Sequence, residues 1–336
     1  MKLVGEINGT DFRMIREMAG SNYNGYSTEG KLSTLDLSEA KIVKGGDSYY
    51  SGDNCYTSND EIGEYAFHDC SGLTSLTLPA GITSISDCAF EGCSGLTSLT
   101  LPAGITSIGC RAFYWCSGLT NLTLPDGITS IGSGAFSDCS GLTSLILPAG
   151  ITSISDCAFR LCSGLTSLTL PDGITSISDC AFEDCSGLTS LTLPAGITSI
   201  GISAFSDCSG LTSLTLPAGL TQIDDYAFSE CSGLTSIYVY AEKVPKIGED
   251  VFKGCEAKKC ILYVPKGTYD DYWLSDFGYF ENIVEFEATG IDKTTTSSDV
   301  EEVSRYSVNG QRLVGPTKGL NIVKYSDGSV KKVAVE

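Results

Sequence analysis

Residues 70–92 read Cys70-Ser-Gly-Leu-Thr-Ser-Leu-Thr-Leu-Pro-Ala-Gly-Ile-Thr-Ser-Ile-Ser-Asp-Cys-Ala-Phe-Glu-Gly92, and Cys93 begins nearly the same stretch again. The phenylalanine near the end of this unit recurs at intervals of 23 residues, at Phe67, Phe90, Phe113, Phe136, Phe159, Phe182, Phe205 and Phe228. A fixed period of about 20 to 50 residues is typical of architectures in which each unit contacts only its neighbours. The repeat therefore decides the fold, and the flanking segments are expected to close its ends.

The pattern within one unit predicts a short strand followed by turns. In Leu73-Thr-Ser-Leu-Thr-Leu78 the last two leucines alternate with small polar residues, as in a strand with one buried face. Pro79 and Gly81 end this strand, and further apolar side chains follow at Ile82, Ile85, Ala89 and Phe90. One unit cannot enclose these side chains alone. We therefore expect the copies to stack as a solenoid whose parallel strands lie about 4.8 Å apart.

Composition excludes several classes of function. The 336 residues carry a formal net charge of -20, and the pI is near 4.3. Nucleic acids and anionic membranes require concentrated Lys and Arg, so neither is expected as a partner. No apolar run approaches the 18 or so residues that a membrane span needs. No signal peptide is visible after Met1, which indicates either a cytosolic protein or one whose leader peptide has been removed.

The chain divides into five predicted segments. Leu3 to Ile7 reads as a strand, Thr10 or Asp11 as the cap of a helix that ends at Gly20, and residues 32–37 as a first rung before an insertion. Within the array, strands are expected to start at Leu73 and at the equivalent leucines. Aromatic residues after Thr268 are expected to form a lid over the last turn. The segments are an N-terminal cap (1–61), the array (62–240), a degenerate last repeat with an aromatic cap (241–288), a linker (289–303) and a small β tail with two hairpin signals (304–336).

Cysteine is the most conspicuous candidate for chemistry. Of the 15 cysteines, nine share one position of the repeat: Cys70, Cys93, Cys116, Cys139, Cys162, Cys185, Cys208, Cys231 and Cys255. Zinc sites use tighter pairs in a compact set of four ligands, so no metal is expected. Neighbouring turns lie close enough together for disulfides between them. However, side chains in one column point the same way, which is poor for the dihedral angle that a disulfide requires. We interpret these cysteines as buried, mostly reduced thiols that fill space as small apolar groups, with some disulfides as the alternative.

Nothing in the sequence predicts catalysis or a cofactor. The single histidine, His68, lies in a turn without an obvious triad partner, and we interpret it as solvent-exposed. Glycines follow the repeat and form no phosphate-binding loop. We therefore expect a protein that is not an enzyme, with no cofactor.

At this point the repeats identify a family resemblance. The 23-residue units with Ala-Phe, Cys-Ser-Gly-Leu and Leu-Pro-Ala-Gly-Ile elements resemble the BspA-like leucine-rich-repeat proteins over roughly residues 1 to 288. The resemblance implies a right-handed leucine-rich-repeat coil with a parallel β-sheet and a small C-terminal β module. Tyr306-Ser-Val-Asn-Gly-Gln-Arg through Glu336 resembles the C-terminal type IX secretion sorting domains of Gram-negative anaerobes. Together they imply an exported, surface or secreted protein that acts in adhesion and binds host matrix proteins such as fibronectin.

Variation between copies indicates where a ligand would bind. The outward strand face is mostly Ser and Thr, whereas the turn around each phenylalanine differs between copies. Aromatic and Arg residues dominate protein interfaces, so this edge is the candidate contact patch, against the alternative of tolerated surface drift. The candidates are Arg111, Tyr114, Trp115, Arg160 and Leu161. We expect a monomer that binds a protein; a structural spacer and a glycan-binding surface protein are the alternatives, although the repeats supply no clustered aromatic and acidic residues for the latter.

Overall fold

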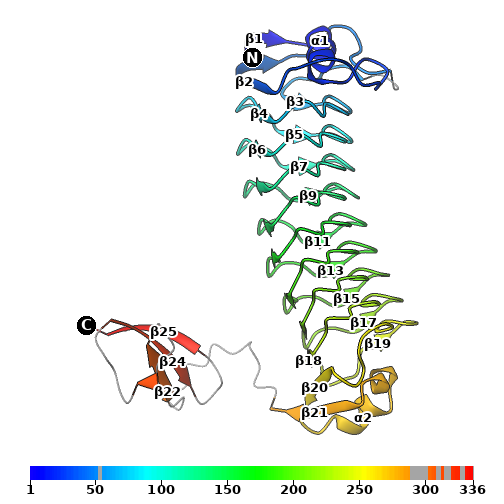
Figure 1. Cartoon of the computed structure of the whole chain (residues 1–336), viewed down its shortest axis with the longest axis vertical. Coiled ribbons are helices and arrows are strands. Elements are labelled where there is room, and N and C mark those ends of the chain that lie inside the picture. Colours follow the sequence, from blue (N-terminus) through cyan, green and yellow to red (C-terminus); the bar gives the residue numbers. More distant parts are fainter. Residues whose placement is uncertain (52–54, 288–301, 308–311, 314–318, 326–329, 336) are drawn as a thin grey trace. The chain divides into compact units, whose positions relative to one another are not determined.

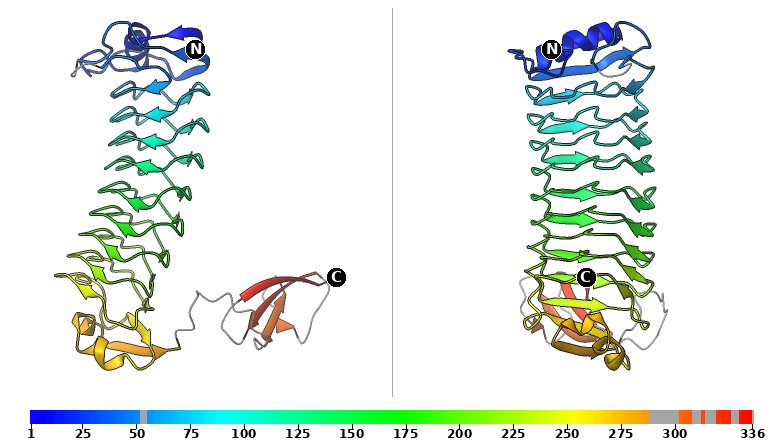
Figure 2. Two further views of the ribbon diagram at one scale, coloured as in Figure 1. Left: turned by 180° about the vertical axis from the view of Figure 1, so that it is seen from behind. Right: turned by 90° about the vertical axis from the view of Figure 1, so that its right-hand side faces the viewer.

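The computed structural model describes residues 1–51 and 55–287, and beyond them the backbone of four strands between residues 302 and 335. The chain forms two compact units, Met1–Phe286 and Glu287–Glu336. The first unit is a solenoid of stacked turns with parallel strands (Figures 1 and 2), so the predicted fold class is confirmed.

Each turn of the array contributes two short strands, one to each of two parallel ladders. Equivalent residues pair in register, as Ser75 with Ser98 and Ser98 with Asn121. The first ladder contains β4 (Ser75–Thr77), β6 (Ser98–Thr100), β8 (Asn121–Thr123), β10 (Ser144–Ile146), β12 (Ser167–Thr169), β14 (Ser190–Thr192), β16 (Ser213–Leu216), β18 (Ser236–Val239) and β20 (Ile261–Pro265). The second contains β3 (Glu61–Ile62), β5 (Ser84–Ile85), β7 (Ser107–Ile108), β9 (Ser130–Ile131), β11 (Ser153–Ile154), β13 (Ser176–Ile177), β15 (Ser199–Ile200), β17 (Gln222–Ile223) and β19 (Lys246–Ile247).

The strands of the first ladder begin later than the sequence predicts. Leu73 is buried, but its N–H bonds to the carbonyl of Cys70 within its own turn, and the strand starts at Ser75. The expected strand starts at Leu73 and at the equivalent leucines are therefore wrong by two residues. A leucine can bury its side chain in a tight turn as well as in a strand, so the apolar pattern does not mark the boundary.

Phenylalanine rings form the axis of the core. Every repeat phenylalanine from Phe67 to Phe228 is fully buried, and neighbouring rings lie parallel with centroids 5.1–5.4 Å apart. The backbone around each ring also bonds to the next turn: Phe90 N–H donates to the carbonyl of Ala112 at 2.7 Å, for example. This third backbone ladder continues between the turns of Phe136 and Phe159, where both strand ladders are interrupted. The backbone around the phenylalanines is therefore the part of the solenoid where hydrogen bonding between turns is uninterrupted.

The N-terminal end is closed by strand β1 (Lys2–Ile7), helix α1 (Gly9–Ala19) and strand β2 (Thr34–Ile42). Asn8 caps α1 in a capping box with Asp11, so the expected caps Thr10 and Asp11 are wrong in position, whereas Gly20 ends the helix as predicted. Asn8 lies before the first residue of the apolar helical pattern. The pattern therefore places the cap two or three residues too late. Strand β2 is the first rung, but it runs on into the segment predicted as an insertion.

The C-terminal end of the first unit is closed by aromatic residues, as predicted. Helix α2 (Tyr269–Trp273) and the 3-10 helix η1 (Asp276–Tyr279) bring Tyr272, Phe277 and Phe280 into the core against Phe252. Thr268 precedes α2, but its hydroxyl donates to the carbonyl of Pro265 and does not cap the helix. A further strand that the sequence pattern missed, β21 (Asn282–Phe286), pairs in parallel with β20.

The second unit is a four-stranded antiparallel sheet. Its strands are β22 (Glu302–Ser307), β23 (Arg312–Leu313), β24 (Gly319–Tyr325) and β25 (Val330–Val335), in the order β23-β22-β24-β25. The two hairpin turns predicted at 309–310 and 327–328 lie outside the described residues, as do residues 289–301 of the predicted linker. No helix among the described residues is long and apolar enough to cross a membrane.

Candidate functional site

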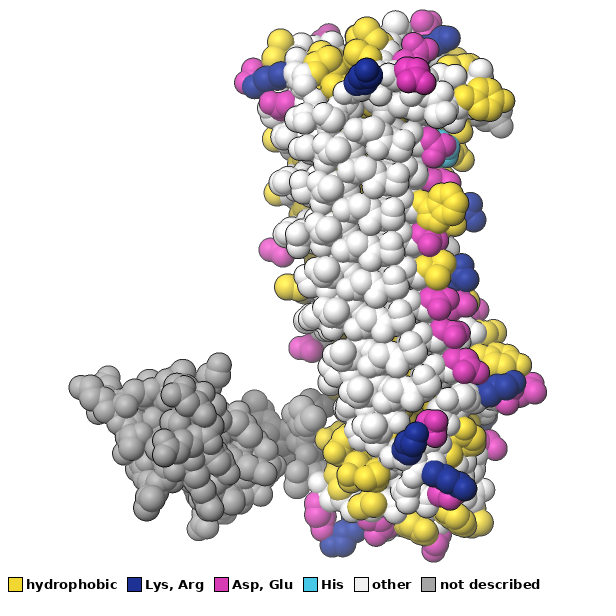
Figure 3. All heavy atoms as spheres, in the orientation of Figure 1, with side chains coloured by type: hydrophobic (Ala, Val, Ile, Leu, Met, Phe, Trp, Pro, Cys, Tyr) yellow, Lys and Arg dark blue, Asp and Glu magenta, His cyan; other side chains and the backbone are white. Residues whose placement is uncertain are grey.

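Four of the five candidate residues lie on one margin of the solenoid, where the third backbone ladder runs, and the fifth, Arg111, lies beside it, two residues before Phe113. We call this margin the variable edge and define it by the two residues that follow each repeat phenylalanine. In chain order these pairs are His68-Asp69, Glu91-Gly92, Tyr114-Trp115, Ser137-Asp138, Arg160-Leu161, Glu183-Asp184, Ser206-Asp207 and Ser229-Glu230. In Figure 3 charged and hydrophobic side chains gather along one margin of the first unit and at its two ends, whereas the broad face between them is mostly uncharged.

The backbone of the variable edge adopts a left-handed conformation once per turn. Its second residue has φ between 57° and 75° from Asp69 to Glu230, which lets its N–H donate to the next turn. Gly and Asp tolerate this conformation best, and they occupy most of these positions. Trp115 and Leu161 each have φ 60°. A bulky residue here costs about 1 to 2 kcal/mol relative to an ordinary backbone conformation.

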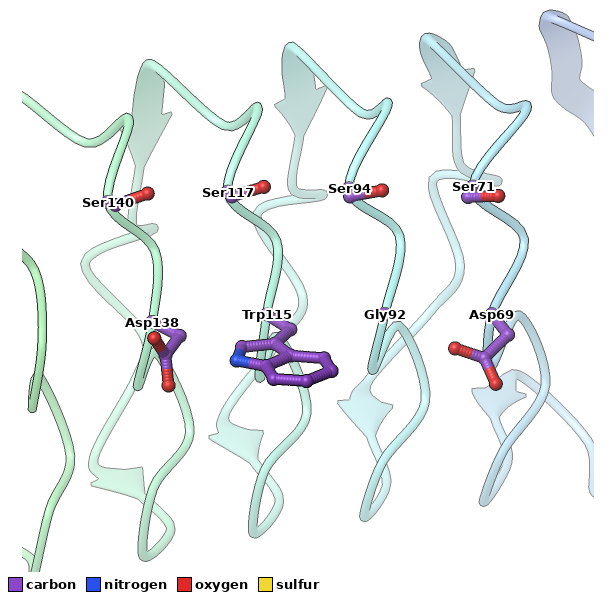
Figure 4. A pocket seen from close by; sticks show the side chains of 8 residues that line it. All are labelled: Asp69, Ser71, Gly92, Ser94, Trp115, Ser117, Asp138 and Ser140. Atoms are coloured by element: carbon purple, nitrogen blue, oxygen red, sulfur yellow. The ribbon is translucent and has the colours of Figure 1, made fainter.

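Trp115 is the most exposed aromatic side chain of the variable edge, at 57%. Its indole nitrogen points toward the carboxylate of Asp138 in the following turn (Figure 4), and Arg160 lies one turn further on. Burial raises the pKa of Asp138, while Trp115 and the charge of Arg160 act in the opposite direction. Asp138 therefore lies between Trp115 and Arg160, an arrangement that the sequence analysis missed.

A shallow groove of about 370 Å³ runs along the variable edge beside Trp115. Its lining alternates between the edge and a row of serines, and consists of Asp69, Ser71, Gly92, Ser94, Trp115, Ser117, Asp138 and Ser140. In Figure 4 the indole of Trp115 points its nitrogen toward Asp138, and the space on its other side, over Gly92, is open as far as Asp69. A side chain on Gly92 would collide with the Asp69 carboxylate, so the glycine creates this space.

The remaining candidates flank Trp115 on both sides. The ring of Tyr114 stacks on that of Trp115 with centroids 5.6 Å apart, and the guanidinium of Arg111 lies 5.8 Å from the centre of the Tyr114 ring. Two turns on, Arg160 Nε donates to Glu183 Oε2 at 2.6 Å, and Leu161 is half-buried. The structure thus brings Arg111, Tyr114 and Trp115 together, and Asp138 lies between this group and Arg160.

His68 is less exposed than the sequence indicates. Its ring is enclosed by Tyr50 and Tyr65, and only 15% of its side chain is accessible, so the interpretation as a solvent-exposed turn histidine is wrong. Its Nδ1 lies 3.2 Å from Asp69 Oδ2, and Glu91 lies on the other side of the ring. Burial lowers the pKa of His68 against the opposing effect of these carboxylates. Tyr50, the aromatic side chain that covers His68, comes from the N-terminal cap. Its position beside His68 cannot be predicted from the repeat pattern.

The nine cysteines of the repeat column are buried thiols, as predicted, and eight of them, Cys93 to Cys255, also donate hydrogen bonds. Cys116 Sγ donates to the carbonyl of Phe90 at 3.1 Å, and the same relation recurs from Cys93 to Cys255. Threonines of the repeat follow the same rule: Thr97 Oγ1 donates to the carbonyl of Thr74 at 3.2 Å. Within the described residues, no group of three or more His, Cys, Asp or Glu side chains could hold a metal ion. The cysteines and threonines that recur at these positions therefore stabilise the contacts between turns.

The outward face of the first strand ladder is plain over most of its length. Ser and Thr side chains alternate there with buried leucines, and Ile146 is an isolated exposed apolar residue at 71%. Tyr238 and Tyr263 stack at 4.3 Å at the C-terminal end of this face, and the edge of Phe286 lies against Tyr238.

Comparison with known proteins identifies the repeat. The description "BspA type Leucine rich repeat region" matches residues 60–170 and 152–266, in six copies, which is more than half of the chain. The chain belongs to the BspA-type leucine-rich-repeat family. Leucine-rich repeats are scaffolds and not an enzyme family. No curated protein matches the chain.

Solved structures of bacterial leucine-rich-repeat proteins are similar to the first unit. A leucine-rich repeat protein from Bacteroides ovatus is 25% identical with a TM-score of 0.58, over 79% of this chain and 68% of that one. A leucine-rich repeat protein of T. pallidum is 31% identical with a TM-score of 0.46, over 54% and 79%. A leucine rich cell surface protein from Faecalibacterium prausnitzii is 23% identical with a TM-score of 0.47, over 77% and 89%. The BspA-type repeat supports a role in protein interaction.

Proposed function

We propose that this protein is a non-enzymatic recognition and adhesion protein, cell-surface or secreted, that binds a protein ligand through the variable edge. The observation that carries this proposal is Trp115: an exposed indole, held in a costly backbone conformation, in a groove between two carboxylates. Tryptophan is the residue type that most often dominates binding energy in protein interfaces. The cysteines and threonines that recur in every copy form hydrogen bonds inside the stack. The variable edge is therefore the surface whose residues can differ between copies.

The chemistry of the groove favours a basic side chain of the partner. Between Trp115 and Asp69 a Lys or Arg head would meet an aromatic face, a carboxylate and the serine hydroxyls of Ser71 and Ser94. A cation over an aromatic ring contributes about 0.5 to 2 kcal/mol. The net charge of -20 adds long-range attraction for a basic surface.

Family membership supports the location and the class of ligand. BspA-like proteins are typically exported and bind host matrix proteins such as fibronectin, and the C-terminal unit, which resembles a sorting domain, fits an exported chain. We therefore take extracellular-matrix proteins as the first ligands to test.

The test is binding of the full chain to immobilised fibronectin, collagen and laminin, and to an array of cell-surface glycans. The triple variant with Arg111, Tyr114 and Trp115 replaced by alanine is compared with Ile146→Ala, which removes an exposed apolar side chain from the strand face. Saturable binding to a matrix protein that only the triple variant weakens, by about tenfold or more, is the expected result. Binding to glycans alone would replace the protein ligand with a saccharide, and no binding to either panel would favour a structural spacer.

A further inference from the structure

The second cysteine column, which lies two residues before each phenylalanine, contains one pair of thiols in neighbouring turns. At this position the chain has Tyr65, Cys88, Arg111, Gly134, Cys157, Cys180, Ser203 and Tyr226, so Cys157 and Cys180 are the neighbours. Both have φ 54°, and both are half-buried. Both lie within the same short sequence, Ser-Asp-Cys-Ala-Phe, at residues 155–159 and 178–182.

The two thiols occupy equivalent positions in neighbouring turns of the solenoid. These turns pair in register, Ser153 with Ser176 and Ile154 with Ile177. The turns that carry them are closely packed, because the backbone N–H of Cys157 donates to the carbonyl of Asp179 at 2.9 Å and the Phe159 and Phe182 rings lie 5.3 Å apart. A spacing of this size between equivalent residues falls within the Cα separation of about 4.4 to 6.8 Å that a disulfide spans.

The surroundings of this pair differ from those of the hydrogen-bonded column. A buried thiol such as Cys162 donates to the carbonyl of Phe136 in a dry core. Cys157 and Cys180 are instead accessible at the surface, next to the ion pair of Arg160 and Glu183. Burial raises the pKa of both thiols, that of Cys180 to about 12, and the Glu183 charge acts in the same direction, whereas the Arg160 charge opposes the shift at both.

We propose that Cys157 and Cys180 form a site of reversible oxidation, in which a disulfide joins two turns of the solenoid beside the variable edge. The reaction is thiol–disulfide exchange with a small-molecule disulfide. One protein thiolate attacks a sulfur of oxidised glutathione, and one glutathione thiol leaves. The second protein thiolate then attacks the mixed disulfide, the second glutathione thiol leaves, and the two protons of the cysteines end on the two glutathiones. The disulfide closes a loop of one repeat, which restricts the unfolded chain.

The experiment exposes the full chain to oxidised glutathione under native conditions, alkylates all free thiols after denaturation, and counts the alkyl groups by mass. Two fewer than the 15 cysteines should be alkylated. Trypsin cuts after Arg160 and so separates the two cysteines, and the linked peptides 112–160 and 161–243 should appear without reductant and vanish with it. Cys157→Ser and Cys180→Ser should each abolish the link, whereas Cys110→Ser, which removes an exposed thiol with no cysteine beside it in its own column, should leave it intact.

Three outcomes would overturn the proposal. One is alkylation of all 15 cysteines after oxidation. Another is stable attachment of glutathione to Cys157 and Cys180 without a bond between them. The third is a disulfide that survives in both serine variants, which would place it elsewhere, for instance between Cys110 and Cys88. Folding of each variant is checked by circular dichroism before oxidation, so that exposure of the core thiols by unfolding is recognised.

Discussion

The thiol of Cys93 donates a hydrogen bond to the carbonyl oxygen of Phe67, 3.0 Å away in the preceding turn, and the same oxygen accepts the N–H of Cys70 at 3.0 Å. Burial raises the pKa of Cys93 well above its ordinary value, so the thiol stays protonated and remains a donor. The relation repeats along the array, which explains why cysteine occupies this position in every turn. An apolar filler alone would not satisfy the phenylalanine carbonyl twice.

Replacing one of these cysteines by alanine should therefore weaken the stack. Cys139→Ala removes a buried sulfur and its bond to the Phe113 carbonyl, and the free energy of unfolding is expected to fall by about 1 to 3 kcal/mol. Cys110→Ala, at an exposed thiol, should change it by less than about 0.5 kcal/mol. Urea unfolding followed by circular dichroism measures both. Equal stability of the two variants would show that the hydrogen bond and the buried volume contribute nothing.

Trp115 should be dispensable for stability. Replacing it by glycine relieves a left-handed conformation that costs about 1 to 2 kcal/mol, against a loss of about 0.5 to 1 kcal/mol from the more flexible unfolded chain. We expect Trp115→Gly to unfold at an unchanged or slightly higher urea concentration. The matched control is Trp273→Gly in helix α2, which should lower stability by about 0.5 kcal/mol. A clear loss of stability in Trp115→Gly would instead assign the indole a structural role.

His68 should make stability depend on pH. Burial between Tyr50 and Tyr65, with Arg16 nearby, lowers its pKa in the folded state below the unfolded value of about 6.5, although Asp69 and Glu91 oppose the shift. The unfolded state then binds more protons, so the stability present above about pH 6.5 is lost as pH falls through that value toward the folded pKa. Between about pH 7.5 and 5, wild-type protein should lose more stability than His68→Gln. Parallel curves for the two proteins would mean that the folded and unfolded pKa values are equal.

Arg16 connects the N-terminal cap to the first turn of the array. Its side chain is fully buried, donates to the carbonyl of Tyr65 at 2.6 Å and to Ser21 Oγ at 3.0 Å, and lies 4.9 Å from the centre of the Tyr50 ring. Arg16→Met keeps most of the volume but leaves these acceptors unsatisfied, and should cost about 1 to 3 kcal/mol. Hydrogen exchange should show that the loss is concentrated in α1 and the first turns. Uniform exchange along the array would contradict this account.

The repeat could be predicted from sequence because its period and its apolar positions are independent of tertiary detail. Apolar side chains must be buried, and this requirement predicts the buried phenylalanines, the parallel register and the aromatic C-terminal closure. Strand boundaries could not be predicted, because Leu73 is buried equally well in a turn. Strand β21 was missed because no repeat leads into it, and the Asn8 cap because its side chain acts outside the helical pattern.

The candidate site was only half visible in the sequence. Variation between copies selected Arg111, Tyr114, Trp115, Arg160 and Leu161, but not the acidic partners Asp69 and Asp138, which resemble ordinary solvated residues until the turns are stacked. The spacing itself held a signal, since residues 23 apart are neighbours in the stack and Asp138 follows Trp115 at that interval. Gly92 could be recognised as the opening of the groove only once its place beside Trp115 was known.

The most direct test of the central claim compares the affinity of Trp115→Ala and Ile146→Ala for immobilised fibronectin, each as the full chain at low and at physiological salt. If the variable edge is the contact surface, Trp115→Ala weakens binding by about tenfold or more, Ile146→Ala leaves it unchanged, and the affinity of the wild-type chain falls as salt rises. Fibronectin binding that is unaffected by Trp115→Ala but lost in Ile146→Ala would move the site to the strand face and contradict the account.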